Sequence, residues 1–221
     1  MLKIYAGDRR TLRYVTSIAM QDGSERTTTQ TSAMTTVDDL WYLADEAKRQ
    51  AEQTYHNLTE RYDGFREFET RKQVHRRRFE TVARRIKDNG APYGAHTLTY
   101  RGCGELLLVR HDGVDLWVLP GGETNGDEPF CDAARRELRE EAGVEADYDG
   151  LAMLGRVTFV SGNHSTWGVL PIFSATPKGT AEDLHIEDPD GEISAAAWFD
   201  ELPADTRDRE QLRRWRARTL E

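Results

Sequence analysis

The pattern of apolar residues first becomes regular at Thr36, where a helical repeat begins. Threonine suits an N-cap because its side-chain oxygen accepts a hydrogen bond from a first-turn amide, and the helix dipole favours Asp38 and Asp39 behind it. The apolar positions form one long stripe: Val37, Leu40, Trp41, Ala44, Ala47, Ala51, Tyr55, Leu58, Tyr62 and Phe65. This spacing predicts an amphipathic helix that ends near Asp63-Gly64.

A second stripe with spacings of three and four follows directly. It contains Phe65, Phe68, Lys72, His75, Phe79, Val82 and Ile86. Asp88-Asn89-Gly90 and Pro92 then end the predicted helix. We therefore expect residues 36–90 to be a helical region. Two helices could pair as a hairpin, or one long helix could pair with a second copy of the chain, and the sequence leaves both arrangements open.

After Pro92 the period shortens to that of strands. The predicted strands are Ala95–Tyr100, Glu105–Arg110, Leu116–Leu119, Leu151–Val160, Trp167–Ser174 and Ile193–Phe199, and the predicted helices are Pro129–Ala142 and Asp208–Arg218. The first two strands flank a Gly102-Cys103-Gly104 turn and are expected to form a hairpin. Strands mixed with two helices predict an α+β or α/β sandwich.

Composition narrows the class of protein. The chain has 221 residues, of which 38% are hydrophobic and 31% charged, and it contains two cysteines. No apolar run approaches the roughly 18 residues of a membrane span, and two cysteines are too few for a disulfide scaffold, so we expect a cytoplasmic protein. We also expect residues 1–35 to be a flexible tail with a short strand near Leu12–Ala19, and translation could begin at Met34.

Charge is distributed unevenly along the chain. The net charge is −9, but residues 1–90 carry 17 basic and 14 acidic residues, whereas residues 91–221 carry 13 and 25. This asymmetry predicts regions with different roles: the tail (1–35), the helical region (36–90) and a domain spanning 91–221.

One segment of the predicted helix after Pro129 concentrates acidic side chains. Glu137, Glu140 and Glu141 are spaced i, i+3 and i+4, so their carboxylates share one helix face. Three like charges this close repel unless a cation relieves them, and carboxylate oxygens without nearby His or Cys favour Mg²⁺ or Mn²⁺. Arg136 and Glu128 could form a bidentate pair between the helix and the preceding loop.

The whole segment from Gly122 to Val144 resembles the signature of the Nudix hydrolase family. Leu119-Pro120-Gly121-Gly122 resembles the family's approach to that signature, and the likeness extends from about residue 92 to the C-terminus. The resemblance implies an α/β/α sandwich with a mixed sheet. It also implies a pyrophosphohydrolase that uses Mg²⁺ (or Mn²⁺) to cleave a nucleoside diphosphate linked to another moiety.

Roles for individual residues follow from the same resemblance. It implies that Glu137, Glu140, Glu141 and the Gly122 carbonyl are metal ligands, that Glu137 or Glu140 orients or deprotonates water, and that Glu128 and Arg136 are structural. Family members often supply the general base from outside the signature. Here the acid-rich loop 178–192 offers six carboxylates, and Glu192 is our first choice because it precedes the final strand.

The substrate is not determined by these residues. Val160, Ser161 and Gly162 occupy the positions where related enzymes carry marker residues, and neither the proline nor the tyrosine marker is present. We expect ADP-ribose or another nucleotide sugar. Trp167, Phe159 and Tyr148 could stack on a base, although strand aromatics are mostly core residues.

A second hypothesis concerns the basic segment 65–87. This segment carries nine basic and three acidic residues and could contact nucleic-acid phosphates, which would suit a nucleotide-sensing regulator or an RNA-processing protein. The alternatives are a solvated helix face and a homodimer formed through helices 36–88.

Overall fold

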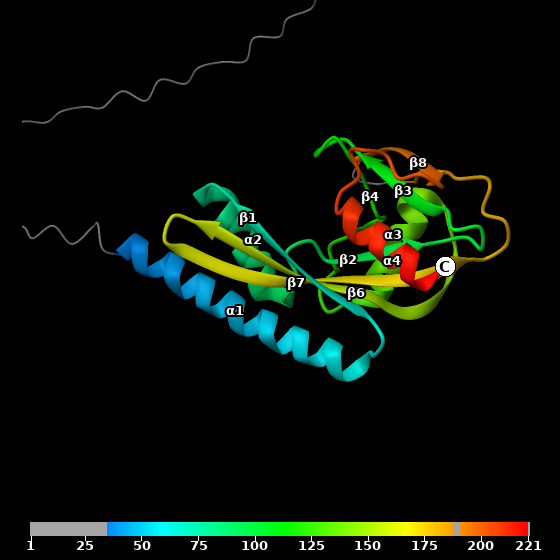
Figure 1. The fold of residues 1–221 in the computed structure, drawn as a ribbon. Coiled ribbons are helices and arrows are strands. Elements are labelled where there is room, and N and C mark those ends of the chain that lie inside the picture. Colours follow the sequence, from blue (N-terminus) through cyan, green and yellow to red (C-terminus); the bar gives the residue numbers. More distant parts are fainter. Residues whose placement is uncertain (1–34, 188–190, 221) are drawn as a thin grey trace, which may run out of the picture.

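The computed structural model describes residues 35–187 and 191–220. The expectations for the tail, namely the strand near Leu12–Ala19 and the start at Met34, lie outside the described residues. The helices are α1 (Thr35–Arg61), α2 (Arg76–Asn89), α3 (Phe130–Ala142) and α4 (Arg209–Thr219). The strands are β1 (Arg66–Gln73), β2 (Ala95–Thr99), β3 (Leu106–His111), β4 (Leu116–Val118), β5 (Gly121–Gly122), β6 (Ala146–Ser161), β7 (His164–Pro177) and β8 (Ile193–Phe199) (Figure 1).

The strands form two sheets. The larger sheet has the order β1-β6-β7-β2-β5 and is mixed, because β1 runs parallel to β6 and β2 runs parallel to β7. The smaller sheet has the order β4-β3-β8 and is antiparallel. The expected α/β fold with a mixed sheet is confirmed.

Helices cover both faces of the larger sheet. On β2, Thr97 faces α3 and its hydroxyl donates to the Ala134 carbonyl at 3.0 Å. The neighbouring Leu98 points to the opposite face, since side chains alternate along a strand, and it shares a buried cluster with Leu212 and Trp215 of α4. The sheet is therefore packed between α3 and α4.

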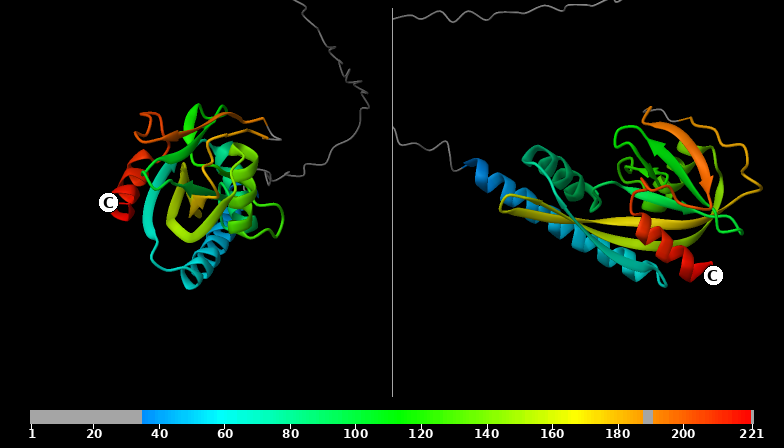
Figure 2. Two further views of the ribbon diagram at one scale, coloured as in Figure 1. Left: turned by 90° about the vertical axis from the view of Figure 1, so that its right-hand side faces the viewer. Right: turned by 45° about the horizontal axis from the view of Figure 1, so that its top comes forward.

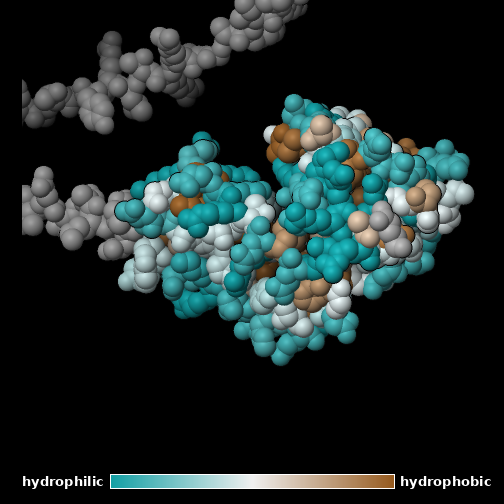
Figure 3. All heavy atoms as spheres, viewed as in Figure 1, coloured by the Kyte–Doolittle hydropathy of each residue, from teal (hydrophilic) through white to brown (hydrophobic). Residues whose placement is uncertain are grey.

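The β6–β7 hairpin extends well beyond β2 and β5, β1 pairs with it as far as Val160, and α1 runs along it (Figures 1 and 2). Ala44, Ala47 and Ala51 of α1 are buried, and their small side chains let the helix approach β7 closely enough for the Thr166 hydroxyl to donate to the Ala44 carbonyl. The surface is hollowed between the end that carries α2 and the end that carries β3, β4 and β8 (Figure 3).

The prediction that residues 65–75 continue a helix is wrong. Residues 66–73 form β1, in which Phe68, Thr70 and Lys72 face inward and the residues between them are exposed. Phe68 and Lys72 also fit a helical stripe, so the apolar spacing alone was ambiguous. The parallel pairing with β6 decided the outcome because it satisfies the backbone along one side of β1. The predicted break at Asp63-Gly64 is present, with Gly64 at φ 70°.

Two further expectations need correction. Ala95–Tyr100 and Glu105–Arg110 do not form a hairpin, because β2 pairs with β7 and β5 whereas β3 pairs with β4 and β8, and one isolated Tyr100–Leu106 bridge joins them. Trp41, assigned to the apolar stripe of α1, is 57% exposed, since the contact face is occupied by smaller residues. No helix within the described residues is long and apolar enough to cross a membrane.

Candidate active site

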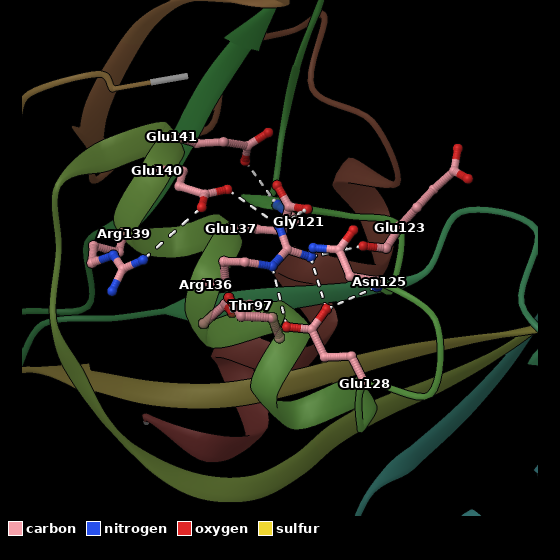
Figure 4. A network of polar contacts seen from close by, with 11 residues as sticks. Thr97, Gly121, Glu123, Asn125, Glu128, Arg136, Glu137, Arg139, Glu140 and Glu141 are labelled. Carbon is pink, nitrogen blue, oxygen red and sulfur yellow. Dashed lines mark hydrogen bonds and ion pairs between the residues drawn. The ribbon is translucent and has the colours of Figure 1, made fainter. Parts of the chain in front are cut away.

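The three signature glutamates lie on α3 beside β5 and the loop that follows it. Arg136 donates from Nη1 to both Glu137 (2.7 Å) and Glu140 (3.2 Å), and the Gly121 amide donates to Glu141 at 2.8 Å (Figure 4). The helix therefore presents two carboxylates converging on one guanidinium nitrogen and a third held against β5.

Arg136 also joins the helix to the loop before it. Its Nε and Nη2 donate to the two oxygens of Glu128 at 3.1 and 3.0 Å, and Nη2 donates to the Glu123 carbonyl (Figure 4). These bonds, together with one from the Asn125 amide, hold the pKa of Glu128 below its ordinary value. The Glu128 and Glu137 hydrogen bonds raise the pKa of Arg136, so this cation stays charged.

Glycines allow the backbone to pass close to these carboxylates. A Cβ on Gly122 would lie 2.6 Å from Glu137 Oε1, and a Cβ on Gly94 would lie 1.8 Å from the Gly122 carbonyl oxygen. Gly121 has φ 151°, and a Cβ there would lie 2.3 Å from the Ala95 carbonyl oxygen. The approach of β5 to α3 and β2 thus requires residues without side chains.

The carboxylate oxygens of Glu137, Glu140 and Glu141 are ligands that suit a hard cation, but their arrangement in the structure is not that of a metal site. Among residues 35–187 and 191–220, no three acidic, histidine or cysteine side chains are close enough together to hold a metal ion. The reason is visible in the contacts above: Arg136 already supplies positive charge where Glu137 and Glu140 converge. A divalent ion bound there would displace Arg136 from part of its contact with the two carboxylates. Carboxylate oxygens are the ligands that Mg²⁺ prefers.

The acid-rich loop reaches the site with a residue other than the one we favoured. Glu192 lies beside the three-stranded sheet, with its carboxylate 3.4 Å from the His111 ring. Glu187, earlier in the loop, donates its amide to the Glu140 carbonyl at 2.8 Å. Asp188 and Asp190 lie outside the described residues. The sequence marked this loop as a source of carboxylates but could not determine which of them borders α3.

The aromatic candidates for base stacking are mostly packed in the interior. Phe159 is fully buried, and Trp167 is covered by the Arg156 guanidinium at 3.9 Å from the ring centroid. The Tyr148 hydroxyl lies 2.8 Å from that of Thr97, and burial raises the pKa of Tyr148 to about 12. His164 lies at the β6–β7 turn, where its ring contacts Phe79.

A cavity lies on the face of the large sheet opposite α3. Its apolar lining is Phe68, Val118, Leu119, Met153, Val157, Leu170, Ile172 and Leu212, and its polar lining is Thr70, Lys72, Tyr93, His96, Arg207, Asp208 and Gln211. Sequence reasoning missed this cavity, because its residues come from β1, β2, β4, β6, β7 and the start of α4 and carry no shared spacing. His96 of β2 is part of the polar lining.

The described residues form a mixed α/β domain in which one helix carries a cluster of glutamates beside a two-glycine strand. A family model described as the NUDIX domain matches residues 92–219, and the chain belongs to this family. The recognition made from the signature is therefore confirmed.

Named relatives support the same family over shorter spans. A "Putative 8-oxo-dGTP diphosphatase" of Bacillus subtilis (strain 168) is 32% identical over 88 residues, which is 39% of this chain and 59% of that protein. An "RNA pyrophosphohydrolase" of Bartonella clarridgeiae is 50% identical over 44 residues, which is 19% of this chain and 25% of that protein. The chain thus spans less than two thirds of the length of either relative.

Among solved structures, a MutT NUDIX hydrolase from Burkholderia pseudomallei is 25% identical with a TM-score of 0.41. The match covers 57% of this chain and 95% of that one. The residues before 92, including α1, β1 and α2, lie outside the family match.

Proposed function

We propose that this protein is a metal-dependent pyrophosphohydrolase that cleaves a nucleoside diphosphate linked to another moiety. The observation that carries the proposal is the convergence of Glu137 and Glu140 on one cationic nitrogen, with Glu141 held at the adjoining strand. Membership of the NUDIX family also supports it.

The chain's own residues define how such a reaction would be organised. Glu137, Glu140 and Glu141 would hold Mg²⁺ or Mn²⁺, with the Gly122 carbonyl as a further ligand. The bound ion would neutralise charge on the phosphoryl oxygens and lower the pKa of the attacking water. Glu128 and Arg136 would keep the loop against the helix, so that the carboxylates retain their geometry when substrate arrives.

We propose candidates for the group that accepts the proton of the attacking water from two regions, α3 and the acid-rich loop 178–192. Glu137 or Glu140 could orient or deprotonate the water directly, and Glu192 remains the proposal for a base outside the signature. The contact between Glu187 and the Glu140 carbonyl makes Glu187 the alternative in the same loop. Glu187→Gln and Glu192→Gln would separate the two, because loss of the true base removes the acid limb of the pH–rate profile.

The substrate is proposed as a nucleotide-type small molecule, with ADP-ribose and nucleotide sugars as the starting set. The relatives' names widen the set to 8-oxo-dGTP and RNA.

The test is Mg²⁺-dependent release of a nucleoside monophosphate from a panel of these compounds. Glu140→Gln and Glu141→Gln should reduce turnover by at least about 100-fold, whereas Glu145→Gln, an exposed position just after α3, should not. Unchanged turnover in both site variants would refute the metal-site assignment. Binding of Mn²⁺, followed by electron paramagnetic resonance, gives a second readout that does not depend on activity.

A second candidate is nucleic-acid binding by the basic segment 65–87. One observation favours it: Arg85 of α2 forms an ion pair with Glu123 at 2.5 Å, and Glu123 belongs to the loop that Arg136 contacts. The basic face of α2 therefore adjoins the proposed pyrophosphate site. Arg77 and Arg84 are exposed on that face. An RNA whose 5′ end reached the carboxylates could continue across it.

A homodimer through residues 36–88 and a cytoplasmic location remain proposals. The apolar stripe of α1 packs within the same chain, against α2 and β7, which leaves Trp41 and Tyr42 as its exposed large apolar side chains. A scattering mass of twice the chain mass, reduced by replacing both aromatics with serine, would support the dimer.

A further inference from the structure

The loop that joins β5 to α3 is held from outside the family match as well as from within it. This β5–α3 loop spans residues 123–129, and Arg136 of α3 holds it through the Glu128 carboxylate (Figure 4). On its other side, Asn89 donates from Nδ2 to the Thr124 hydroxyl at 2.9 Å. Asn89 is the last residue of α2, and the NUDIX match begins only after that helix. A residue that precedes the family domain therefore contacts the loop that carries Glu128.

Asn89 is itself fixed by α1, by β7 and by the turn that follows α2. The Thr54 hydroxyl of α1 donates to the Asn89 carbonyl at 3.1 Å, and the Ala91 amide donates to the Asn89 side-chain oxygen at 2.8 Å. Because that oxygen accepts from a backbone amide, the side-chain nitrogen is the atom that faces the loop. Gly90 caps α2 at φ 89°, and its carbonyl accepts from Val169 of β7 at 2.9 Å. The donor of the Asn89 side chain thus has a rigid support.

The linker between α2 and β2 is also packed tightly against the site. A Cβ on Gly90 would lie 2.2 Å from the Thr54 hydroxyl oxygen, and one on Gly94 would lie 1.8 Å from the Gly122 carbonyl oxygen. Both glycines have positive φ, at 89° and 68°, a conformation that glycine adopts without steric cost. The linker therefore places the end of α2 directly beside β5 and the start of the β5–α3 loop.

A second contact joins α2 to the same loop but holds it less firmly. Arg85 forms an ion pair with Glu123, and the two side chains are 35% and 56% exposed. Water and salt screen a pair this exposed, so its contribution is small. The bond between Asn89 and Thr124 is uncharged and partly buried, so it depends little on ionic strength. The position of the loop relative to α2 therefore rests chiefly on Asn89.

We propose that Asn89 is a positioning residue that holds the β5–α3 loop, so that Glu128 and Arg136 keep the α3 carboxylates in their reactive arrangement. This inference rests on the proposed function and deepens it. Asn89 acts through a chain of contacts: it binds Thr124, the loop carries Glu128, and Glu128 binds Arg136, which donates to two carboxylates of α3. The segment before the family domain is then part of the catalytic unit.

The first test removes either partner of the bond and measures steady-state kinetics with Mg²⁺. The substrate is the compound of the panel above that the wild type hydrolyses fastest. Asn89→Ala and Thr124→Val should each lower kcat by about 10-fold and leave KM within about two-fold, because misplaced groups slow the reaction although the substrate still binds. Thr124→Ser keeps the hydroxyl and should restore kcat to within about two-fold of the wild type.

The double variant Asn89→Ala with Thr124→Val tests whether the two side chains act as one unit. If they act through their mutual hydrogen bond, its kcat should lie within about two-fold of that of Asn89→Ala alone. Losses that multiply to about 100-fold would overturn the inference, because Thr124 would then act independently of Asn89. Asp88→Ala is the matched control, since it removes an exposed side chain one position earlier on α2, and its kcat should equal that of the wild type.

A measurement without turnover separates this inference from the proposed function. Amide hydrogen exchange of Asn125 and Glu128, followed by nuclear magnetic resonance, reports opening of the loop, because both amides are hydrogen-bonded within it. Their exchange should be about 5-fold faster in Asn89→Ala and in Thr124→Val, as expected for the loss of one hydrogen bond, and unchanged in Asp88→Ala. Equal acceleration of the α4 amides would mean general destabilisation and would overturn the inference.

The two readouts together assign each failure to one proposal. If no compound of the panel is hydrolysed but exchange of the loop changes as expected, the hydrolytic proposal fails and the role of Asn89 in holding the loop stands. If a compound is hydrolysed and both single variants keep the wild-type kcat, the role of Asn89 fails alone. If no compound is hydrolysed and exchange does not change, both proposals fail.

Discussion

Arg136 and Glu128, eight residues apart in the sequence, are joined by two parallel hydrogen bonds of 3.1 and 3.0 Å. The same guanidinium reaches Glu137 and Glu140 with its remaining nitrogen. A planar group with five donors can bind one carboxylate through two parallel hydrogen bonds and still donate to two others, whereas an ammonium has only three donors. Arg136 therefore holds the loop residue Glu128 and the helix residues Glu137 and Glu140 together in the candidate site.

Arg136→Lys should therefore be damaging although it preserves the charge. We expect a loss of about 1–3 kcal/mol in the free energy of unfolding, because the fork to Glu128 is broken, and a fall in kcat/KM of about 10-fold or more. Urea denaturation and steady-state kinetics measure the two effects. Arg135→Lys, an exposed neighbour on the same helix, should change neither; equal behaviour of the two variants would contradict this account.

Glu128 should make stability sensitive to acid. Its pKa lies below the ordinary value of 4.5, chiefly because of the hydrogen bonds from Arg136. A group with a depressed pKa in the folded state stabilises the fold above its unfolded pKa, and this contribution is lost as the pH falls through the folded pKa. The stability difference between wild type and Glu128→Gln should be constant above about pH 5.5 and shrink below pH 4.5. A difference that does not vary between pH 7 and pH 3 would exclude this role.

Gly122→Ala should impair the site while leaving the fold intact. The new Cβ would lie 2.6 Å from Glu137 Oε1, so the carboxylate must move. Turnover should fall by about 10-fold or more, with a far-ultraviolet circular dichroism spectrum like that of the wild type. Gly102→Ala is the matched control, since no atom lies within 4 Å of the Cβ it would introduce. Wild-type turnover in Gly122→Ala would show that Glu137 is not constrained as we describe.

Phe68→Ala should destabilise the whole protein. The side chain is 8% exposed and belongs to the main buried cluster, so its removal should cost about 3 kcal/mol. Glu69→Ala, exposed on the other side of β1, should change stability by less than about 0.5 kcal/mol. A single unfolding transition in both variants is expected, because β1 pairs with β6. Separate transitions would instead support independent units before and after residue 91.

The basic face of α2 gives a prediction about polyanions. Arg77→Gln with Arg84→Gln should lower the slope of log affinity against log salt for a single-stranded RNA by about one to two units. Arg213→Gln with Arg218→Gln, two exposed arginines on α4, removes the same charge elsewhere and should leave the slope unchanged. Equal losses in both double variants would mean that only net charge matters.

The sequence by itself determined the local features of the catalytic half. α3 spans Phe130–Ala142, within one residue of the predicted range; Pro129 is its N-cap, and Gly143 takes the left-handed conformation of a C-cap with φ 68°. The spacing of Glu137, Glu140 and Glu141 places them on one face for the same local reason. Helix periodicity and capping depend on neighbours within a few residues, so they can be read from a single chain.

Only the tertiary structure decided what depends on distant partners. Residues 66–73 became a strand because β6 offers an edge for hydrogen bonding, although Phe68 and Lys72 equally fit a helical stripe. The same pairing brings Lys72 to a cavity shared with His96 and Arg207, which lie far along the chain. Apolar spacing constrains the period of an element, but the free energy that selects between two periods comes from burial against other elements.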